Sequence, residues 1–377
     1  MITLKNHEYF SLFTTIIRDF KLKGELTGIT CVSTGNINDT YVVSTVINGM
    51  EKEYILQRVN HKVFSNPDKV AENVCKVTDH VEKKLRESGY KDIRRRVMRY
   101  YRKSDGSYFH ITDDGNYWRV LSCVYNAVSI DFADIPHLRA AGIAFGEFQN
   151  YLSDFPAESL YETIPDFHNT AKRYDNLRKA ASSDAFGRLS SVKEEYDYLM
   201  SMENEATLLC KLSENGLLPH RVVHNDTKCN NVMFDSVTGE HLAVIDLDTV
   251  MEGLVAYDFG DAVRFAANPG GEDNEDTSKI YLDLDYYSAF AEGFVPCLIG
   301  KVTDKEIETL PDGVLAITLE LAARFLTDYL NGDVYFKCKR DKHNLIRTKA
   351  QIALAKDVFG KMPELRKRLS AIVEENR

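Results

Sequence analysis

The chain lacks the features that mark membrane, secreted and nucleic-acid-binding proteins. It has no apolar run near the roughly 20 residues that span a bilayer, and it does not begin with the basic-then-apolar layout of a secretory signal. It also lacks an excess of positive charge, since 47 Lys and Arg face 57 Asp and Glu for a formal net charge of −10. That balance provides no electrostatic footprint for nucleic acid and disfavours an anionic membrane surface. We therefore expect neither a nucleic-acid partner nor a membrane.

The sequence also lacks closely spaced pairs of cysteines. The seven cysteines are scattered singly and show no C-x-x-C spacing. Their odd number and isolation are typical of reduced thiols and exclude an obvious zinc site, so we expect a cytoplasmic protein. Core-forming residues are abundant, with 44% hydrophobic and 11% aromatic residues in 377 positions. This is enough for two lobes that share a cleft.

The most informative pattern lies in residues 222–248, which read VVHNDTKCNNVMFD, then a turn, then LAVIDLD. Asp226 stands two positions after a histidine, and Asn231 follows five positions later. Asp246 ends an apolar strand predicted over 242–245. The order H-x-D-x-x-x-x-N, hairpin, strand, Asp is typical of the catalytic and metal-binding core of kinase-like phosphotransferases.

The chemistry of phosphoryl transfer assigns a role to each of these residues. One carboxylate must accept the proton of the attacking hydroxyl, and we assign that role to Asp226. Asn231 and Asp246, which a hairpin over 232–245 brings to the same end of a ribbon, provide the oxygen ligands that Mg²⁺ prefers, with ATP phosphates completing the shell. Lys228 can reach the transferred phosphate as a point charge. The alternative interpretation is that these residues only form turns and cap a strand.

Residues 1–124 are predicted to form a β-rich nucleotide-binding lobe. The expected strands are 26–33, 40–46, 53–59, 94–101, 108–112 and 117–124, with one helix over 66–87. Gly35, Asn36, Ile37 and Asn38 lie in the first strand–loop–strand unit. Backbone N–H groups of such a turn can bind an anion, so this loop is a candidate cover for the ATP phosphates, although a plain hairpin would look the same.

Residues 125–377 are predicted to form a helical catalytic and substrate lobe. After a first helix near 138–152, long helices are expected over 191–215, 281–294, 304–330 and 342–359. The fold class that we predict is α+β, a protein-kinase-like two-lobed fold with a small β-rich N-lobe and a larger helical C-lobe. Asp258 and Asp261 are expected to hold the catalytic loop by hydrogen bonds, with Arg264 as a partner three positions on.

A family resemblance extends over almost the whole chain. The segments that carry it are Tyr54–Gln57, Ala144–Asn150, His224–Asn231, Ile245–Thr249, Asp258–Asp261, Glu292–Val295, Arg324–Phe336 and His343–Thr348. They resemble the aminoglycoside phosphotransferase-like kinases, which include choline and homoserine kinases, and within that family most of all the bacterial N-acetylhexosamine 1-kinases. The resemblance implies ATP- and Mg²⁺-dependent phosphorylation of the anomeric hydroxyl of N-acetylglucosamine or N-acetylgalactosamine.

The resemblance also implies site residues beyond the kinase core. Asp226 matches the base that contacts the sugar hydroxyl, and Arg324 and Tyr335 match positions that line the sugar pocket. The alternative for Arg324 is a surface pair with Asp328, four residues on. Gln57 stands on the third strand where many relatives place a basic residue that contacts phosphate, and we retain it as a nucleotide-binding candidate.

A second departure concerns substrate preference. Asn36 replaces the histidine of the most similar members, which leaves the sugar preference open. The remaining alternatives are a kinase for another small alcohol, such as choline, homoserine or a different sugar, and a catalytically inactive nucleotide-binding regulator. The three intact core residues argue against the regulator. We leave the oligomeric state open.

Overall fold

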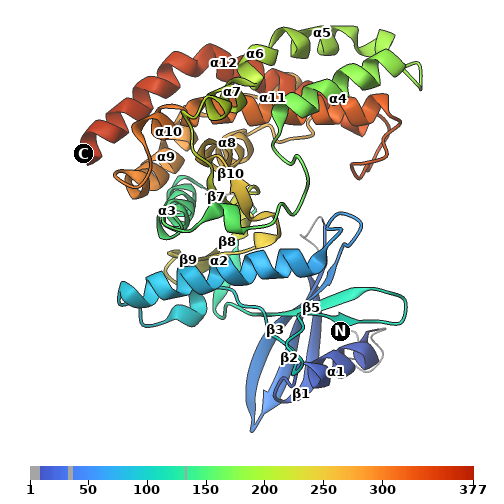
Figure 1. The fold of residues 1–377 in the computed structure, drawn as a ribbon, viewed down its shortest axis with the longest axis vertical. Coiled ribbons are helices and arrows are strands. Elements are labelled where there is room, and N and C mark those ends of the chain that lie inside the picture. Colours follow the sequence, from blue (N-terminus) through green and yellow to red (C-terminus); the bar gives the residue numbers. More distant parts are fainter. Residues whose placement is uncertain (1–8, 33–36, 132–133) are drawn as a thin grey trace.

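A computed structural model describes residues 9–32, 37–131 and 134–377. Its N-terminal part is a five-stranded antiparallel sheet with the strand order β1-β2-β3-β5-β4 (Figure 1). The strands are β1 (Glu25–Val32), β2 (Asp39–Ile47), β3 (Met50–Val59), β4 (His110–Ile111) and β5 (Tyr117–Ser122). Helix α1 (Phe10–Asp19) covers part of the sheet, where the Phe13 ring packs edge to face on Tyr41 and Trp118.

Helix α2 (Pro67–Glu87) lies between the sheet and the helical part of the molecule (Figure 1). It begins as its sequence predicts, because the Asn66 side chain accepts the backbone N–H of Lys69 and Pro67 occupies the first helical turn. Its buried face belongs to a core that also contains Leu247 and Val250, which lie just after the predicted metal ligand Asp246. Packing of α2 therefore helps to position the segment that carries the site.

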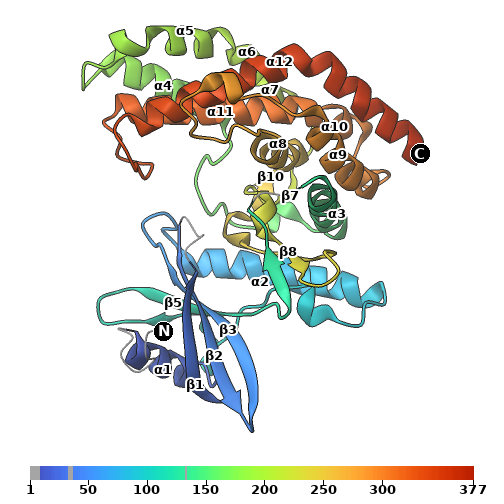
Figure 2. The ribbon, with the colours of Figure 1, turned by 180° about the vertical axis from the view of Figure 1, so that it is seen from behind.

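The larger C-terminal lobe is helical, and its helices pack in layers above α2 (Figure 2). They are α3 (Ile135–Tyr151), α4 (Thr170–Ser183), α5 (Lys193–Ser201), α6 (Glu203–Ala206), α7 (Leu208–Glu214), α8 (Val255–Ala266), α9 (Leu284–Leu298), α10 (Asp304–Glu308), α11 (Leu310–Leu330) and α12 (His343–Asn376). Short strands support the loops of this lobe: β6 (Ala127–Ser129), β8 (Val232–Asp235) and β9 (His241–Val244) form one sheet, and β7 (Arg221–Val223) pairs with β10 (Met251–Gly253).

Helices α8 and α11 touch at backbone distance. A Cβ atom added to Gly260 of α8 would lie 2.3 Å from the carbonyl oxygen of Gly313 in α11. A Cβ added to Gly313 would lie 1.9 Å from the carbonyl oxygen of Ala256. Only glycine fits at these two positions, and the pair fixes the separation of the two helices.

Four predicted elements differ from the structure. Residues 94–101 form no strand, only the 3-10 turn Ile93–Arg95 and a single bridge from Tyr100 to Leu121. Arginine side chains of this segment bond to other elements, as Arg95 does to Asp235 at 2.8 Å, and their partners hold the backbone in an irregular path.

The helix expected over 191–215 is divided into α5, α6 and α7. The Glu203 carbonyl accepts both the Thr207 backbone N–H at 2.9 Å and the Thr207 hydroxyl at 2.7 Å, and such a shared side-chain bond tends to bend a helix. The helix expected over 304–330 is interrupted at Thr309, just before Pro311, which has no N–H to continue it. The last helix continues beyond the predicted 359 to Asn376.

The predicted class is nevertheless correct. The structure has a small antiparallel-sheet lobe and a larger helical lobe, as an α+β two-lobed fold requires. Nowhere in the described ranges is there a helix both long enough and apolar enough to cross a membrane. All seven cysteines are free thiols.

Candidate active site

The catalytic-loop candidate lies between β7 and β8, where Asp226, Lys228 and Asn231 come together. Lys228 Nζ lies 2.7 Å from Asp226 Oδ1. The Asn231 amide donates to the Asp226 backbone carbonyl at 2.8 Å and to its carboxylate at 3.2 Å. The negative charge of Asp226 raises the pKa of Lys228 above its usual range, so the lysine remains a cation and cannot act as a base.

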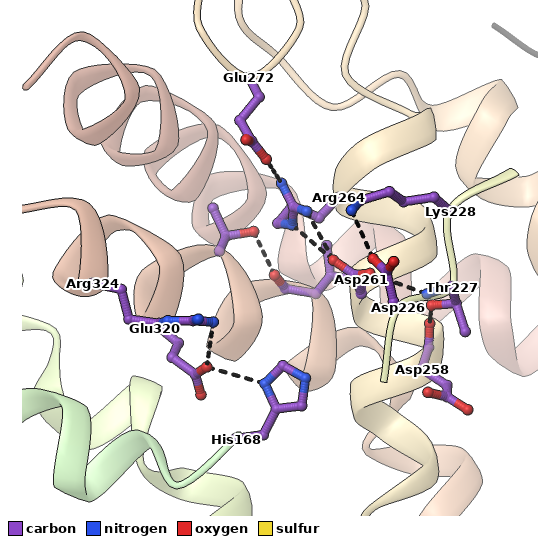
Figure 3. A network of polar contacts seen from close by, with 12 residues as sticks. His168, Asp226, Thr227, Lys228, Asp258, Asp261, Arg264, Glu272, Glu320 and Arg324 are labelled. Carbon is purple, nitrogen blue, oxygen red and sulfur yellow. Dashed lines mark hydrogen bonds and ion pairs between the residues drawn. The ribbon is translucent and has the colours of Figure 1, made fainter. Parts of the chain in front are cut away.

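Two aspartates of α8 hold the backbone on both sides of Asp226. The Asp258 carboxylate accepts the N–H groups of His224 (2.9 Å) and Asn225 (2.8 Å), and Asp261 accepts that of Thr227 (3.2 Å). These bonds confirm the predicted structural role of the two aspartates. Asp261 also pairs with Arg264 at 2.8 Å, as expected (Figure 3).

His224 supports the loop from within. Its Nδ1 lies 3.2 Å from the Asp226 backbone nitrogen, which is always a donor, so Nδ1 must be the accepting nitrogen. Nε2 then carries the proton and donates to the carbonyl of Ile245 at 2.9 Å. Both ring nitrogens are occupied by the backbone, which leaves Asp226 as the available base.

Asp246 and Asn231 meet at one end of the β8–β9 ribbon, as the hairpin predicts. The Ile245 N–H donates to the Asn231 carbonyl at 2.9 Å. Asp246 has a left-handed backbone (φ 59°), a conformation that non-glycine residues adopt mainly where the surroundings enforce it. Asp246 is exposed to solvent on one side, but desolvation by the surrounding protein, together with the charges of Asp248 and Asp226, raises its pKa to about 6.

The oxygen atoms in this corner fit a hard cation. The Asn231 amide nitrogen is directed at Asp226, so its carbonyl oxygen is the atom left for a ligand. No donor in the described part of the chain bonds to the Asp246 carboxylate. Across all residues that the structure describes, no three or more His, Cys, Asp or Glu side chains gather in a way that could hold a metal by themselves. Two protein ligands suit Mg²⁺ that arrives with nucleotide phosphates.

The nucleotide-binding candidates are only partly visible. Gly35 and Asn36 lie outside the described residues, and the Ile37 side chain is exposed. The Asn38 amide donates to Asp248 at 2.8 Å. The Gln57 side-chain oxygen accepts two hydrogen bonds from the guanidinium of Arg119. Sequence reasoning did not single out Arg119. Nucleotide contact by the candidates in this loop and strand remains a prediction.

Arg324 is not a surface residue. Only 12% of its side chain is exposed, and its Nη1 lies 3.8 Å from Glu320. The alternative pairing with Asp328 is wrong, because Asp328 is buried and accepts three backbone N–H groups of residues 334–336 at 2.8 to 3.0 Å. The chain after α11 needs those acceptors to reverse direction. Tyr335 in that turn is 63% exposed.

Glu320 and His168 extend the polar network around Arg324, and sequence reasoning did not predict either. Fully buried, Glu320 accepts the Thr170 hydroxyl at 2.7 Å and lies 3.0 Å from His168 Nδ1. Burial acts to raise the pKa of Glu320, but its hydrogen-bonded and charged neighbours, His168 first, hold it below the usual range. The carboxylate is therefore ionised, and His168 Nδ1–H must donate to it.

The opposite nitrogen of His168 is the notable atom. Its Nε2 is buried and has no hydrogen-bond partner among the described residues. The ring packs on Tyr257 of α8 at 5.2 Å between centroids, beside the aspartates that hold the catalytic loop. Figure 3 shows His168, Glu320 and Arg324 as one cluster on the left, with Asp226, Lys228 and the aspartates of α8 to their right. With Nδ1–H donating to Glu320, Nε2 keeps its lone pair and is a candidate to accept a hydrogen bond from a substrate group.

Comparisons with known proteins bear on the family and the fold. Residues 28–292 match the model of the phosphotransferase enzyme family. Similar solved structures include an aminoglycoside phosphotransferase from Alicyclobacillus acidocaldarius (14% identity, TM-score 0.57, covering 94% of this chain and 95% of that one) and choline kinase from Cryptosporidium parvum (13%, 0.56, 96% and 98%). A spectinomycin phosphotransferase in complex with ADP and spectinomycin is also similar (12%, 0.53, 92% and 98%).

At these identities the structural matches establish the fold, which is the two-lobed kinase-like fold predicted from the sequence. The family match extends from the first strand of the sheet into α9 and includes the catalytic loop. Since it covers well over half of the 377 residues, the chain belongs to the phosphotransferase enzyme family.

Proposed function

We propose that this chain transfers a phosphoryl group from ATP, with Mg²⁺, to the anomeric hydroxyl of an N-acetylhexosamine. Residues 1–124 hold the nucleotide in this proposal, and 125–377 hold the acceptor. Asp226 accepts the hydroxyl proton, and Lys228, which remains charged, faces the transferred group. Asn231 and Asp246 hold the cation, which neutralises the phosphate charge.

The choice of acceptor class rests on the charges of four residues, Arg173, Glu320, Arg324 and His168, which we call the wall of the proposed acceptor site. Arg173 and Arg324 lie close enough that burial and the charge of Arg324 lower the pKa of Arg173. A single buried carboxylate, Glu320, lies between them and His168. The buried Nε of Arg173 lacks a partner in the described residues and is a free donor. Nε2 of His168 also lacks one there, but it is an acceptor when Nδ1–H donates to Glu320. Such a wall offers donors to the oxygen atoms of a neutral polyol or acyl group.

The same wall disfavours a cationic amino alcohol. A quaternary ammonium is recognised by the faces of aromatic rings. Here the Arg324 guanidinium already lies over the rings of Phe167 (5.4 Å) and Phe336 (5.6 Å). A choline-like acceptor would have to displace a buried guanidinium and would face a second one at Arg173. This supports a sugar over choline in this chain.

An acceptor screen tests the proposal. ADP release is measured with Mg²⁺ and ATP against N-acetylglucosamine, N-acetylgalactosamine, glucose, choline and ethanolamine. We expect turnover with at least one N-acetylhexosamine, and ³¹P and ¹H NMR should place the phosphate on the anomeric carbon. A 6-phosphate, or turnover of amino alcohols without any sugar, would overturn the substrate assignment.

Substitution of the wall provides a second test. In Arg324→Leu, sugar hydroxyls lose their donor, so kcat/KM for the sugar should fall by the equivalent of about 2–4 kcal/mol, while the KM for ATP remains unchanged. Arg139→Leu is the matched control, because Arg139 also lies on a helix and pairs with a glutamate, Glu292, but at an exposed site. Equal sugar kinetics in the two variants would remove Arg324 from the acceptor site.

A further inference from the structure

A buried arginine of the small lobe is bonded to the segment that carries the metal-ligand candidate. Arg119 of β5 is 2% exposed. Its guanidinium donates to both oxygens of Asp248 at 2.7 and 2.8 Å and twice to the Gln57 side-chain oxygen at 2.9 and 2.7 Å. The fifth N–H donates to the Tyr100 hydroxyl. Every donor of Arg119 is therefore satisfied inside the protein.

Asp248 occupies a decisive position. It follows the metal-ligand candidate Asp246 by two residues in a short turn, Leu247–Thr249. The Asn38 amide, at the end of the predicted phosphate loop, donates to it at 2.8 Å. Asn38 is fixed in turn by the backbone N–H of Asn60, 3.0 Å away. The Asp248 carboxylate thus connects the sheet, through Arg119, and the predicted phosphate loop, through Asn38, to the turn that follows Asp246.

This arrangement replaces a familiar one. In protein kinases a lysine on the third strand contacts the phosphates and pairs with a glutamate on the following helix. Here the third strand offers Gln57, which lies directly opposite Arg119 in the β3–β5 ladder. On the helix that follows, α2, the buried side chain of Asn73 does not pair with the third strand. Its amide donates to the carbonyls of Tyr161 and Val250. A buried ion pair joins Arg119 of this sheet to Asp248 instead.

We propose that the Arg119–Asp248 pair sets the geometry of the nucleotide–Mg²⁺ site, with Arg119 as a positioning residue that acts through Asp248 on Asp246. The inference rests on the proposed kinase function but not on the identity of the acceptor. Because Arg119 has no donor to spare, it orients the ligand segment and does not itself bind phosphate. Loss of the arginine would leave Asp248 as an unpaired buried charge close to Asp246, and the turn between them would have to move.

Nucleotide binding without an acceptor tests this role. Calorimetric titration of wild type, Arg119→Met and Arg119→Lys with ADP at several Mg²⁺ concentrations, well below each melting temperature, gives the affinity and its Mg²⁺ dependence. Partners that orient a metal ligand typically contribute 10- to 100-fold to affinity, so we expect a loss of about that size in Arg119→Met. Lysine restores the charge but cannot make two parallel bonds to Asp248, so Arg119→Lys should lie in between.

The matched control is Arg58→Met. Arg58 lies on the neighbouring strand β3 and pairs with Asp39 at 2.7 Å, but at an exposed site. We expect its ADP affinity to equal that of wild type. A purely structural role of Arg119 would lower the melting temperature of Arg119→Met and leave both the affinity and its Mg²⁺ dependence unchanged, and that result would overturn the inference.

The outcomes separate the inference from the function on which it rests. If wild type itself does not bind ADP with Mg²⁺, the proposed kinase function fails. If wild type binds and Arg119→Met binds equally well, only the role of Arg119 fails. Should Arg119→Met not fold, Arg119→Lys carries the same test, and wild-type affinity in that variant would refute the role of the bidentate pair.

Discussion

The hold of α8 on the catalytic loop leads to a specific prediction for Asp258→Asn. In the native chain one carboxylate oxygen accepts the N–H of Asn225, and the other accepts the N–H of His224 and the Gln149 amide at 2.7 Å. An amide can present its NH₂ at either position, but in both orientations one backbone N–H loses its acceptor. The peptide groups concerned lie one and two residues before Asp226.

The magnitude follows from burial. An unsatisfied buried N–H costs about 1–3 kcal/mol. Burial raises the pKa of Asp258, so removing its charge offsets part of that loss, and the change in melting temperature should be small. The displaced loop has no such compensation. A shift of the catalytic group by about 1 Å can lower the rate by about 100-fold, and we expect kcat to fall by that order.

Steady-state kinetics and thermal melting of the same variant decide the matter. Asp105→Asn is the control, because Asp105 accepts a backbone N–H and a hydroxyl from Ser107 at an exposed turn and should tolerate the change. If kcat of Asp258→Asn lies within ~3-fold of wild type, well short of the expected loss, the carboxylate does not position the base.

Three further predictions concern the reacting groups. Asp226→Asn cannot accept the hydroxyl proton, so kcat should fall by about 10²–10⁴ while calorimetry still shows ADP binding; full turnover would contradict its role as base. Asn231→Ala or Asp246→Ala each removes an oxygen ligand and should raise the Mg²⁺ concentration needed for half-maximal activity; an unchanged requirement would misplace the metal site. Because Asp246, with a pKa of about 6 before metal binds, must lose its proton to hold a cation, Mg²⁺ affinity should fall as pH drops below about 6 and approach its maximum above pH 7, as Mg²⁺ titrations at pH 5.0 to 8.0 can measure. A flat profile would show that Asp246 is not a ligand.

Local spacing made part of the site predictable. Asp226 and Asn231 are five residues apart on one loop, and a short hairpin returns the chain to Asp246, so the sequence order determines their proximity. The roles of Asp258 and Asp261 were predictable for a similar reason, since one helical turn separates them and places both on the same face of α8.

Contacts between distant segments were not predictable. Arg119 and Asp248 are 129 positions apart, and only the packing of the sheet on the catalytic turn brings them together. His168 lies in an irregular segment with no periodicity to indicate where its ring points. Glu320 did leave a signal, because Glu320 and Arg324 are charged residues one turn apart in a mostly apolar stretch of α11. A charged pair at that spacing inside a buried helix indicates a network and not a solvent-facing bridge.

The glycine contact between α8 and α11 bears on how acceptor preference can change in this chain. Helix α8 carries the aspartates that anchor the base, and α11 carries Arg324 and Glu320. Since Gly260 and Gly313 hold the two backbones at a fixed separation, the width of the proposed acceptor site would be set by the main chain. Exchange of side chains on α11 can alter which oxygen atoms are recognised without altering that width. Enlarging Gly313, by contrast, would shift the whole helix and change the fit of every acceptor at once.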